Sequence, residues 1–134
     1  FSYKPFLVFI IYLYCVMNKL NLARLRQAVR ALKARRNVLE HTAMKHHPML
    51  AASFLERRFR PNGPVACYLS IPHPKNSRHR YVRKSQVDQI RRQTSAWREF
   101  SQALTECVRV NRSIERQLRE IGAKRCRKID LGAR

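Results

Sequence analysis

Arginine and lysine side chains gather on both sides of two aromatic residues, Phe59 and Tyr81, in the middle of the chain. Arginine binds phosphate through paired hydrogen bonds, and an aromatic ring can stack on an unpaired base. We expect the cations to contact the phosphates of a nucleic acid, and the two rings, with Tyr68, to be core residues that face a helix around Trp97. The predicted nucleic-acid-binding residues are Arg57, Arg58, Arg60, Arg78, Arg80, Arg83, Lys84, Arg91 and Arg92. If positions 57, 59, 80 and 82 share one face of a sheet, positions 58, 60, 81 and 83 share the other, and both faces carry cations.

The unbalanced net charge also points to a partner of opposite sign. The 134 residues include 29 Lys and Arg against 8 Asp and Glu, a formal net charge of +21. A compact protein with so much like charge repels itself unless counter-ions or a polyanion screen it. The predicted partner is therefore a nucleic acid, either DNA or RNA. The alternative is a solvated cationic surface without a polyanion, but a few excess charges already suffice for solubility.

Residue types for catalysis and for cofactor binding are sparse. No two of the 8 acidic residues are arranged as a general acid and a general base. The 3 glycines lie too far apart to form a loop that cradles phosphate, and no Ser or Cys stands in a nucleophile motif. We therefore expect no enzymatic activity and no cofactor.

Histidine and cysteine residues lack the spacing of a metal site. His46 and His47 are adjacent, so on a helix their side chains diverge by about 100° and do not easily share one ion. The cysteines, which show no short paired spacing, are Cys15, Cys67, Cys107 and Cys126. A disulfide framework or a zinc ribbon needs such spacing, so we expect no metal and free thiols in a reducing cytoplasm.

An amphipathic helix is predicted over residues 18–45. Its apolar stripe consists of Leu22, Leu25, Val29, Leu32, Leu39 and Ala43. These positions recur every three or four residues, apart from one longer step over Arg36, which is a heptad-type pattern. Pro48 closes the helix because the residue before proline resists the helical conformation. The other helix faces are almost purely cationic, with Glu40 as the one acid.

Short strands are predicted next, over residues 53–59, 66–71 and 79–82. Pro61, Asn62, Gly63 and Pro64 form a strong turn signal between the first two strands. Residues 72–77 contain two prolines and suit a hairpin loop better than a strand. So few short strands are not stable alone in water and need a helix to pack on.

A long helix is predicted from a capping box at 85–88 to Ile121, where Gly122 supplies a stop. Its first apolar stripe consists of Val87, Ile90, Trp97, Leu104 and Val108. Its second stripe consists of Phe100, Leu104, Cys107, Ile114, Leu118 and Ile121. The first half is expected to cover the strands, and the second half to pair antiparallel with the first helix. The predicted fold class is α+β, with a short antiparallel meander between the two helices of a hairpin.

The first 16 residues differ in composition from the rest of the chain. Their apolar run from Phe6 to Met17 is about 12 residues long, whereas a spanning helix needs about 20. The segment begins with Phe and lacks the small-residue cleavage site of a signal peptide. We interpret residues 1–16 as upstream reading frame before Met17, residues 17–122 as one small basic domain and residues 123–134 as a flexible basic tail.

Residues 52–118 resemble a small prokaryotic domain family that is often encoded near mobile elements. The matching stretches are NGPVACYLS at 62–70, RYVRK at 80–84, WREF at 97–100 and VNRSI at 110–114. Family members carry "HGPYYYLS" and "RYV-K" strands between an N-terminal helix and a long C-terminal helix, so the resemblance implies the same fold. They also carry a cysteine cluster before the "HGP" element. This chain lacks that cluster, so Pro61 and Pro64 must hold the turn instead.

Three functions remain open at this point. The favoured one is a cytoplasmic, non-enzymatic nucleic-acid-binding protein with little base specificity, associated with a mobile element. The first alternative is a coiled-coil adaptor that forms a homodimer or docks on a larger mobile-element protein. The second, less favoured, is a membrane-surface protein that uses the N-terminal apolar segment together with the basic helix.

Overall fold

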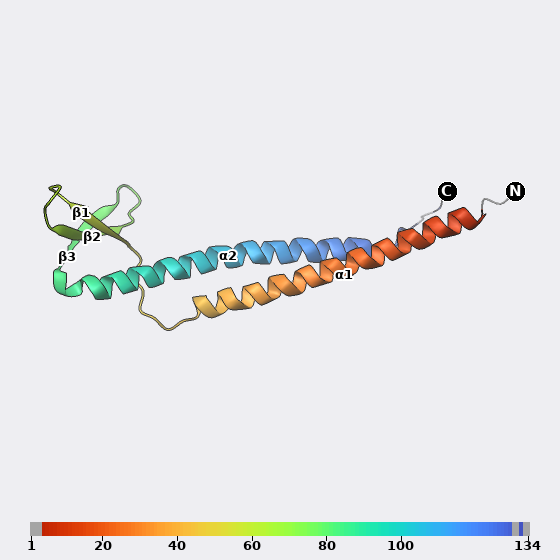
Figure 1. Ribbon diagram of the computed structural model, residues 1–134, viewed down its shortest axis with the longest axis horizontal. Coiled ribbons are helices and arrows are strands. Elements are labelled where there is room, and N and C mark those ends of the chain that lie inside the picture. Colours follow the sequence, from red (N-terminus) through yellow and green to blue (C-terminus); the bar gives the residue numbers. More distant parts are fainter. Residues whose placement is uncertain (1–3, 130–131, 133–134) are drawn as a thin grey trace. The chain divides into compact units, whose positions relative to one another are not determined.

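The computed structural model describes residues 4–129 and residue 132. The elements follow the predicted order of helix, meander and helix (Figure 1): α1 (Lys4–Ala43), β1 (Ser53–Arg58), β2 (Val65–Ile71), β3 (Arg78–Val82), the 3₁₀ helix η1 (Lys84–Gln86) and α2 (Val87–Arg125). This confirms the α+β fold class.

The contacts divide the chain into two compact units. Residues 1–38 and 107–134 form the helical unit, and residues 39–106 form the sheet unit. The predicted extent of a single domain over 17–122 stays a prediction.

In the helical unit, α1 packs against the second half of α2, and the two helices run antiparallel (Figure 1). Val29 on α1 and Val110 and Ile114 on α2 are buried between them. The predicted stripe on α1 is confirmed, since Leu22, Leu25 and Leu32 are half-buried beside Val29. Arg36 fills the gap in that stripe and is also half-buried, as expected for a long side chain whose stem covers apolar surface.

The predicted stripes of α2 are confirmed in part: Phe100, Cys107, Ile114 and Ile121 of the second stripe are buried or half-buried, and Val87 and Ile90 of the first pack on the sheet. Leu104, Val108 and Leu118 were expected inside, but their side chains are 51%, 43% and 49% exposed. The inward positions alternate in steps of four and three: Ala96, Phe100, Ala103, Cys107, Val110, Ile114, Gln117 and Ile121. Ala103 is buried although it is small, and Gln117 is polar, so hydrophobicity did not reveal these two positions of the seam.

Helix α1 begins at Lys4, 14 residues earlier than position 18, where we predicted its start. The reason is that no Gly or Pro follows Pro5 before residue 48, and a proline in the first turn leaves a helix intact. The apolar side chains of residues 7–14 are all exposed. Within 7–43 one 18-residue window has a mean hydropathy of 1.3 and no buried residue. This helix is long and apolar enough to cross a membrane. Signal sequences near an N-terminus meet the same criterion of length and composition.

The predicted ends of α2 need correction at both termini. Ser85 lies inside η1, and α2 begins only at Val87, so Ser85 does not stand at the N-terminal cap of α2 as the predicted capping box requires. At the other end α2 continues through Gly122 to Arg125, and the Cys126 amide donates to the Gly122 carbonyl at 3.1 Å. The helix therefore takes up the first residues of the predicted flexible tail.

The sheet has the strand order β1-β2-β3, and both pairs are antiparallel. Each observed strand lies within one residue of its predicted bounds at both ends. Between β1 and β2 the Gly63 amide donates to the Arg60 carbonyl at 3.0 Å. A β-carbon at position 63 would lie only 3.2 Å from the β-carbon of Arg60, so the turn is tight.

One face of the sheet packs on the start of α2. Ala52, Leu69 and Val82 are buried there, and partly buried Leu50, Cys67, Val87 and Ile90 pack against them. The Leu50 amide donates to the Gln93 carbonyl of α2 at 3.1 Å. The buried Thr94 satisfies its hydroxyl within α2 by donating to the Ile90 carbonyl at 2.9 Å. A short sheet that is not stable alone is thereby anchored to the long helix.

We predict that Leu69→Ala lowers the free energy of unfolding of the sheet unit by about 2–5 kcal/mol, because it leaves a cavity in this core. Val65→Ala is the matched control, on the same strand and face but 38% exposed, and it costs less than about 1 kcal/mol. Urea denaturation followed by the fluorescence of Trp97, the single tryptophan, measures both. Equal losses for the two variants contradict the assigned core.

Candidate nucleic-acid interface

Strand register decides which side chains share a face of the sheet. Leu55 pairs with Tyr68, and Tyr68 pairs with Tyr81. Side chains alternate along a strand, so Arg57 lies on the same face as these residues. The opposite face carries Phe54, Cys67, Leu69, Arg80 and Val82, and it packs on α2. The sequence grouped 57 with 80 and 82 as a condition, and the register groups 57 with 81 instead. The conclusion that both faces carry cations is confirmed, with Arg57 on one face and Arg80 on the other.

The aromatic residues are not core residues, contrary to our expectation. Phe59 is 75% exposed and Tyr81 is 56% exposed. They flank the half-buried Tyr68, with ring centroids 6.4 Å and 5.7 Å from its own. The interplanar angles of 82° and 72° are those of edge-to-face contacts. The inner face is taken by Cys67, Leu69 and Val82, which carry no hydroxyl that must find a partner when buried.

Two of the predicted phosphate-binding residues are engaged within the protein. Arg91 donates from Nη2 to Oε1 of Glu56 at 2.6 Å, and its guanidinium lies 5.1 Å from the centre of the Phe54 ring. Both contacts join α2 to β1. Arg92 donates from Nε to the Asp88 carbonyl at 3.3 Å, within α2. Arg91 therefore has a structural contact that competes with binding a phosphate.

The other predicted binding residues are exposed and surround the sheet. They are Arg57, Arg58, Arg60, Arg78, Arg80, Arg83 and Lys84. Within the described part of the chain, their side chains make no ion pair or hydrogen bond. Glu56 is the only acid between residues 53 and 84, and Arg91 already neutralises it. The electrostatic field around the sheet is therefore dominated by unneutralised positive charge.

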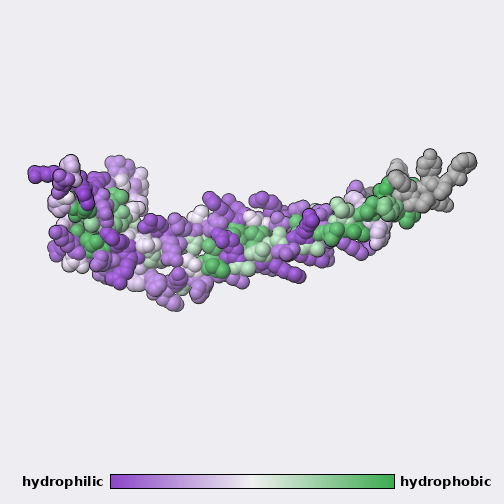
Figure 2. Space-filling model, in the orientation of Figure 1, coloured by the Kyte–Doolittle hydropathy of each residue, from purple (hydrophilic) through white to green (hydrophobic). Residues whose placement is uncertain are grey.

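A second cationic surface lies on the helical unit. α1 carries Arg24, Arg26, Arg30 and Lys33 as exposed residues, and no acid occurs before Glu40. On α2 the charges are partly paired, with Arg119 at 2.7 Å from Glu115 and Lys124 at 3.9 Å from Glu120. Figure 2 shows hydrophilic side chains over much of both units in this view.

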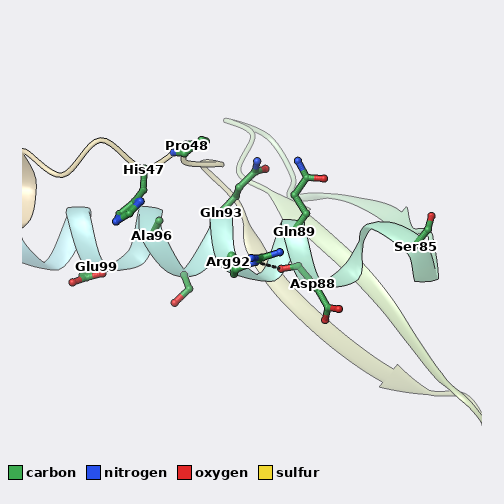
Figure 3. A pocket seen from close by; sticks show the side chains of 10 residues that line it. His47, Pro48, Ser85, Asp88, Gln89, Arg92, Gln93, Ala96 and Glu99 are labelled. Carbon is green, nitrogen blue, oxygen red and sulfur yellow. Dashed lines mark hydrogen bonds between the residues drawn. The ribbon is translucent and has the colours of Figure 1, made fainter.

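A hollow of about 870 Å³ beside the first turns of α2 was not foreseen from the sequence. Its lining includes His47, Asp88, Arg92 and Glu99. Figure 3 shows Asp88, Arg92 and Glu99 spread along α2 and His47 on the neighbouring loop, rather than directed at one point. Acidic and basic side chains are mixed in the lining of the hollow. Its acids repel a phosphate, and its bases repel a metal ion.

Metal ligands do not converge in the described residues, where no group of three or more His, Cys, Asp or Glu side chains could hold an ion. The four cysteines are free, and Cys15 and Cys126 are exposed.

No family model matches the chain, and no curated protein or solved structure matches it either. The family resemblance noted from the sequence therefore stays a prediction.

We predict that Arg91→Ala lowers the free energy of unfolding of the sheet unit by roughly 1 kcal/mol, because it removes an exposed ion pair and a cation–π contact. Arg57→Ala, which removes an equal charge without such contacts, changes it by less than about 0.5 kcal/mol. Urea denaturation followed by Trp97 fluorescence compares them. If the two variants lose the same stability, Arg91 does not hold α2 to the sheet.

Proposed function

We propose that the chain is a non-enzymatic nucleic-acid-binding protein that contacts the phosphate backbone. The single observation that supports this most is the set of exposed, unneutralised cations around the sheet, from Arg57 to Lys84. Surface arginines of ordinary domains usually have acids near them. Here the one acid of the segment is already paired with Arg91 at 2.6 Å.

The energetic reason is the release of counter-ions. Phosphates neutralised by Lys or Arg set free the ions condensed on the nucleic acid, and this favours binding at low salt. The cations lie on strands, just before the tight turn at 61–64 and at the entry to η1 rather than on one protruding helix. This dispersal favours backbone contact with little base specificity, and it leaves DNA and RNA equally suitable.

Affinity should fall steeply with salt, with log affinity linear in log salt concentration. The double variant Arg58→Ala/Arg80→Ala reduces the slope by roughly 1.4–1.8, because each phosphate contact contributes about 0.7–0.9. Fluorescence anisotropy with labelled DNA and RNA oligonucleotides at several salt concentrations measures it.

The matched control for that experiment is Arg119→Ala/Lys124→Ala. It removes the same charge, but both residues already pair with acids of α2, so the slope stays close to that of the unaltered chain. Binding that hardly changes between low and high salt refutes the electrostatic mechanism.

A second candidate function is a homodimeric adaptor, and the exposed Leu104 and Val108 one turn apart on α2 favour it. Light scattering before and after nuclease treatment separates the two functions. The nucleic-acid proposal predicts a large species that nuclease converts to a smaller one. The adaptor predicts a dimer that resists nuclease and dissociates in Leu104→Gln/Val108→Gln.

A further inference from the structure

The sheet leaves one of its two faces open. The inner face packs on α2 through Leu69 and Val82, and no other described element of the sheet unit covers the face of Tyr68 and Tyr81. On this open face the rings of Phe59, just past the end of β1, Tyr68 on β2 and Tyr81 on β3 form a continuous row. The burial of an aromatic ring contributes strongly to the free energy of folding, so the exposure of more than half of two rings needs an explanation.

We infer that the open face stacks the unpaired bases of a single-stranded nucleic acid. Every base has a flat aromatic face, and rings on an open sheet hold unpaired bases by stacking without reading their identity. Phe59 and Tyr81 are the two stacking positions, and Tyr68 orients both through edge-to-face contacts at 6.4 Å and 5.7 Å. This inference rests on the proposed function and names the form of nucleic acid that it takes.

The cations around the rings fit the phosphates that link stacked bases. Arg57 lies on the open face opposite Ala66, which is next but one to Tyr68 on β2. Arg60 follows Phe59 in the chain, and Arg83 is next but one to Tyr81, whereas Arg58 and Arg80 belong to the opposite face. Rings with cations on either side match a strand in which bases and phosphates alternate, whereas an apolar protein partner would gain nothing from so many charges.

A duplex does not fit this face as well. Its bases are already stacked on each other and present only their edges in the grooves. A double helix could therefore use the cations but not the rings. Single-stranded and duplex ligands of the same sequence consequently separate the two kinds of contact.

The test uses the full chain after nuclease treatment, with a mixed-sequence single-stranded 12-mer and its duplex as probes. Phe59→Leu/Tyr81→Leu keeps apolar side chains but removes both rings. Phe59→Tyr/Tyr81→Phe is the matched control, since it alters the same positions and keeps both rings. Circular dichroism and the unfolding transition of Trp97 confirm that both variants fold.

The expected result is a loss of single-strand affinity on the order of 100-fold in the leucine variant, given the usual strength of base stacking on a ring. Its salt slope and its duplex affinity stay unchanged, and the control variant binds like the unaltered chain.

Equal losses of affinity for single strand and duplex, or no loss for either, overturn the stacking inference. Salt-dependent binding in that case still supports the proposed function. Absence of salt-dependent binding to both probes overturns the proposed function itself. If the leucine variant instead changes the mass of the protein and not its affinity, the open face joins two copies of the chain and the inference is wrong.

Discussion

The packing of Leu69 and Val82 on the first turns of α2 is the contact on which the sheet unit depends. Strands of five to seven residues in a three-stranded sheet bury too little by themselves. The helix supplies the missing surface through Val87 and Ile90. Because side chains alternate along each strand, this one contact also decides that Tyr68 and Tyr81 face away from the helix. The open row of rings is thus a consequence of how the core is closed.

The strands and turns were predictable because their signals are local. The turn at 61–64 and the proline-containing loop at 72–77 mark both strand ends within a few residues. The stripe on α1 was equally readable, since Leu22, Leu25, Val29 and Leu32 recur at helical spacing. By contrast, the seam of α2 includes Ala103 and Gln117, which hydrophobicity alone does not select. Which of several overlapping stripes becomes buried depends on the partner helix.

The faces of the sheet could have been assigned correctly from one strand. Along β2 the alternation separates Val65, Cys67, Leu69 and Ile71 from Ala66, Tyr68 and Ser70, and the first set is plainly the more apolar. The faces of β1 and β3 can be assigned only when their register with β2 is known, and the sequence alone does not give that register. The contact of Arg91 with Glu56 and Phe54 was unpredictable for the same reason, since 35 residues separate Arg91 from Glu56.

The tight turn at Gly63 couples the positions of two neighbouring side chains. Any other residue there brings a β-carbon to 3.2 Å from the β-carbon of Arg60, so the turn must shift by a few tenths of an ångström. Arg60 follows Phe59 directly in the chain, and a shift of the turn therefore displaces a cation and a ring together. A single substitution at position 63 therefore alters the placement of the Arg60 charge and of the Phe59 ring together, although it changes neither side chain.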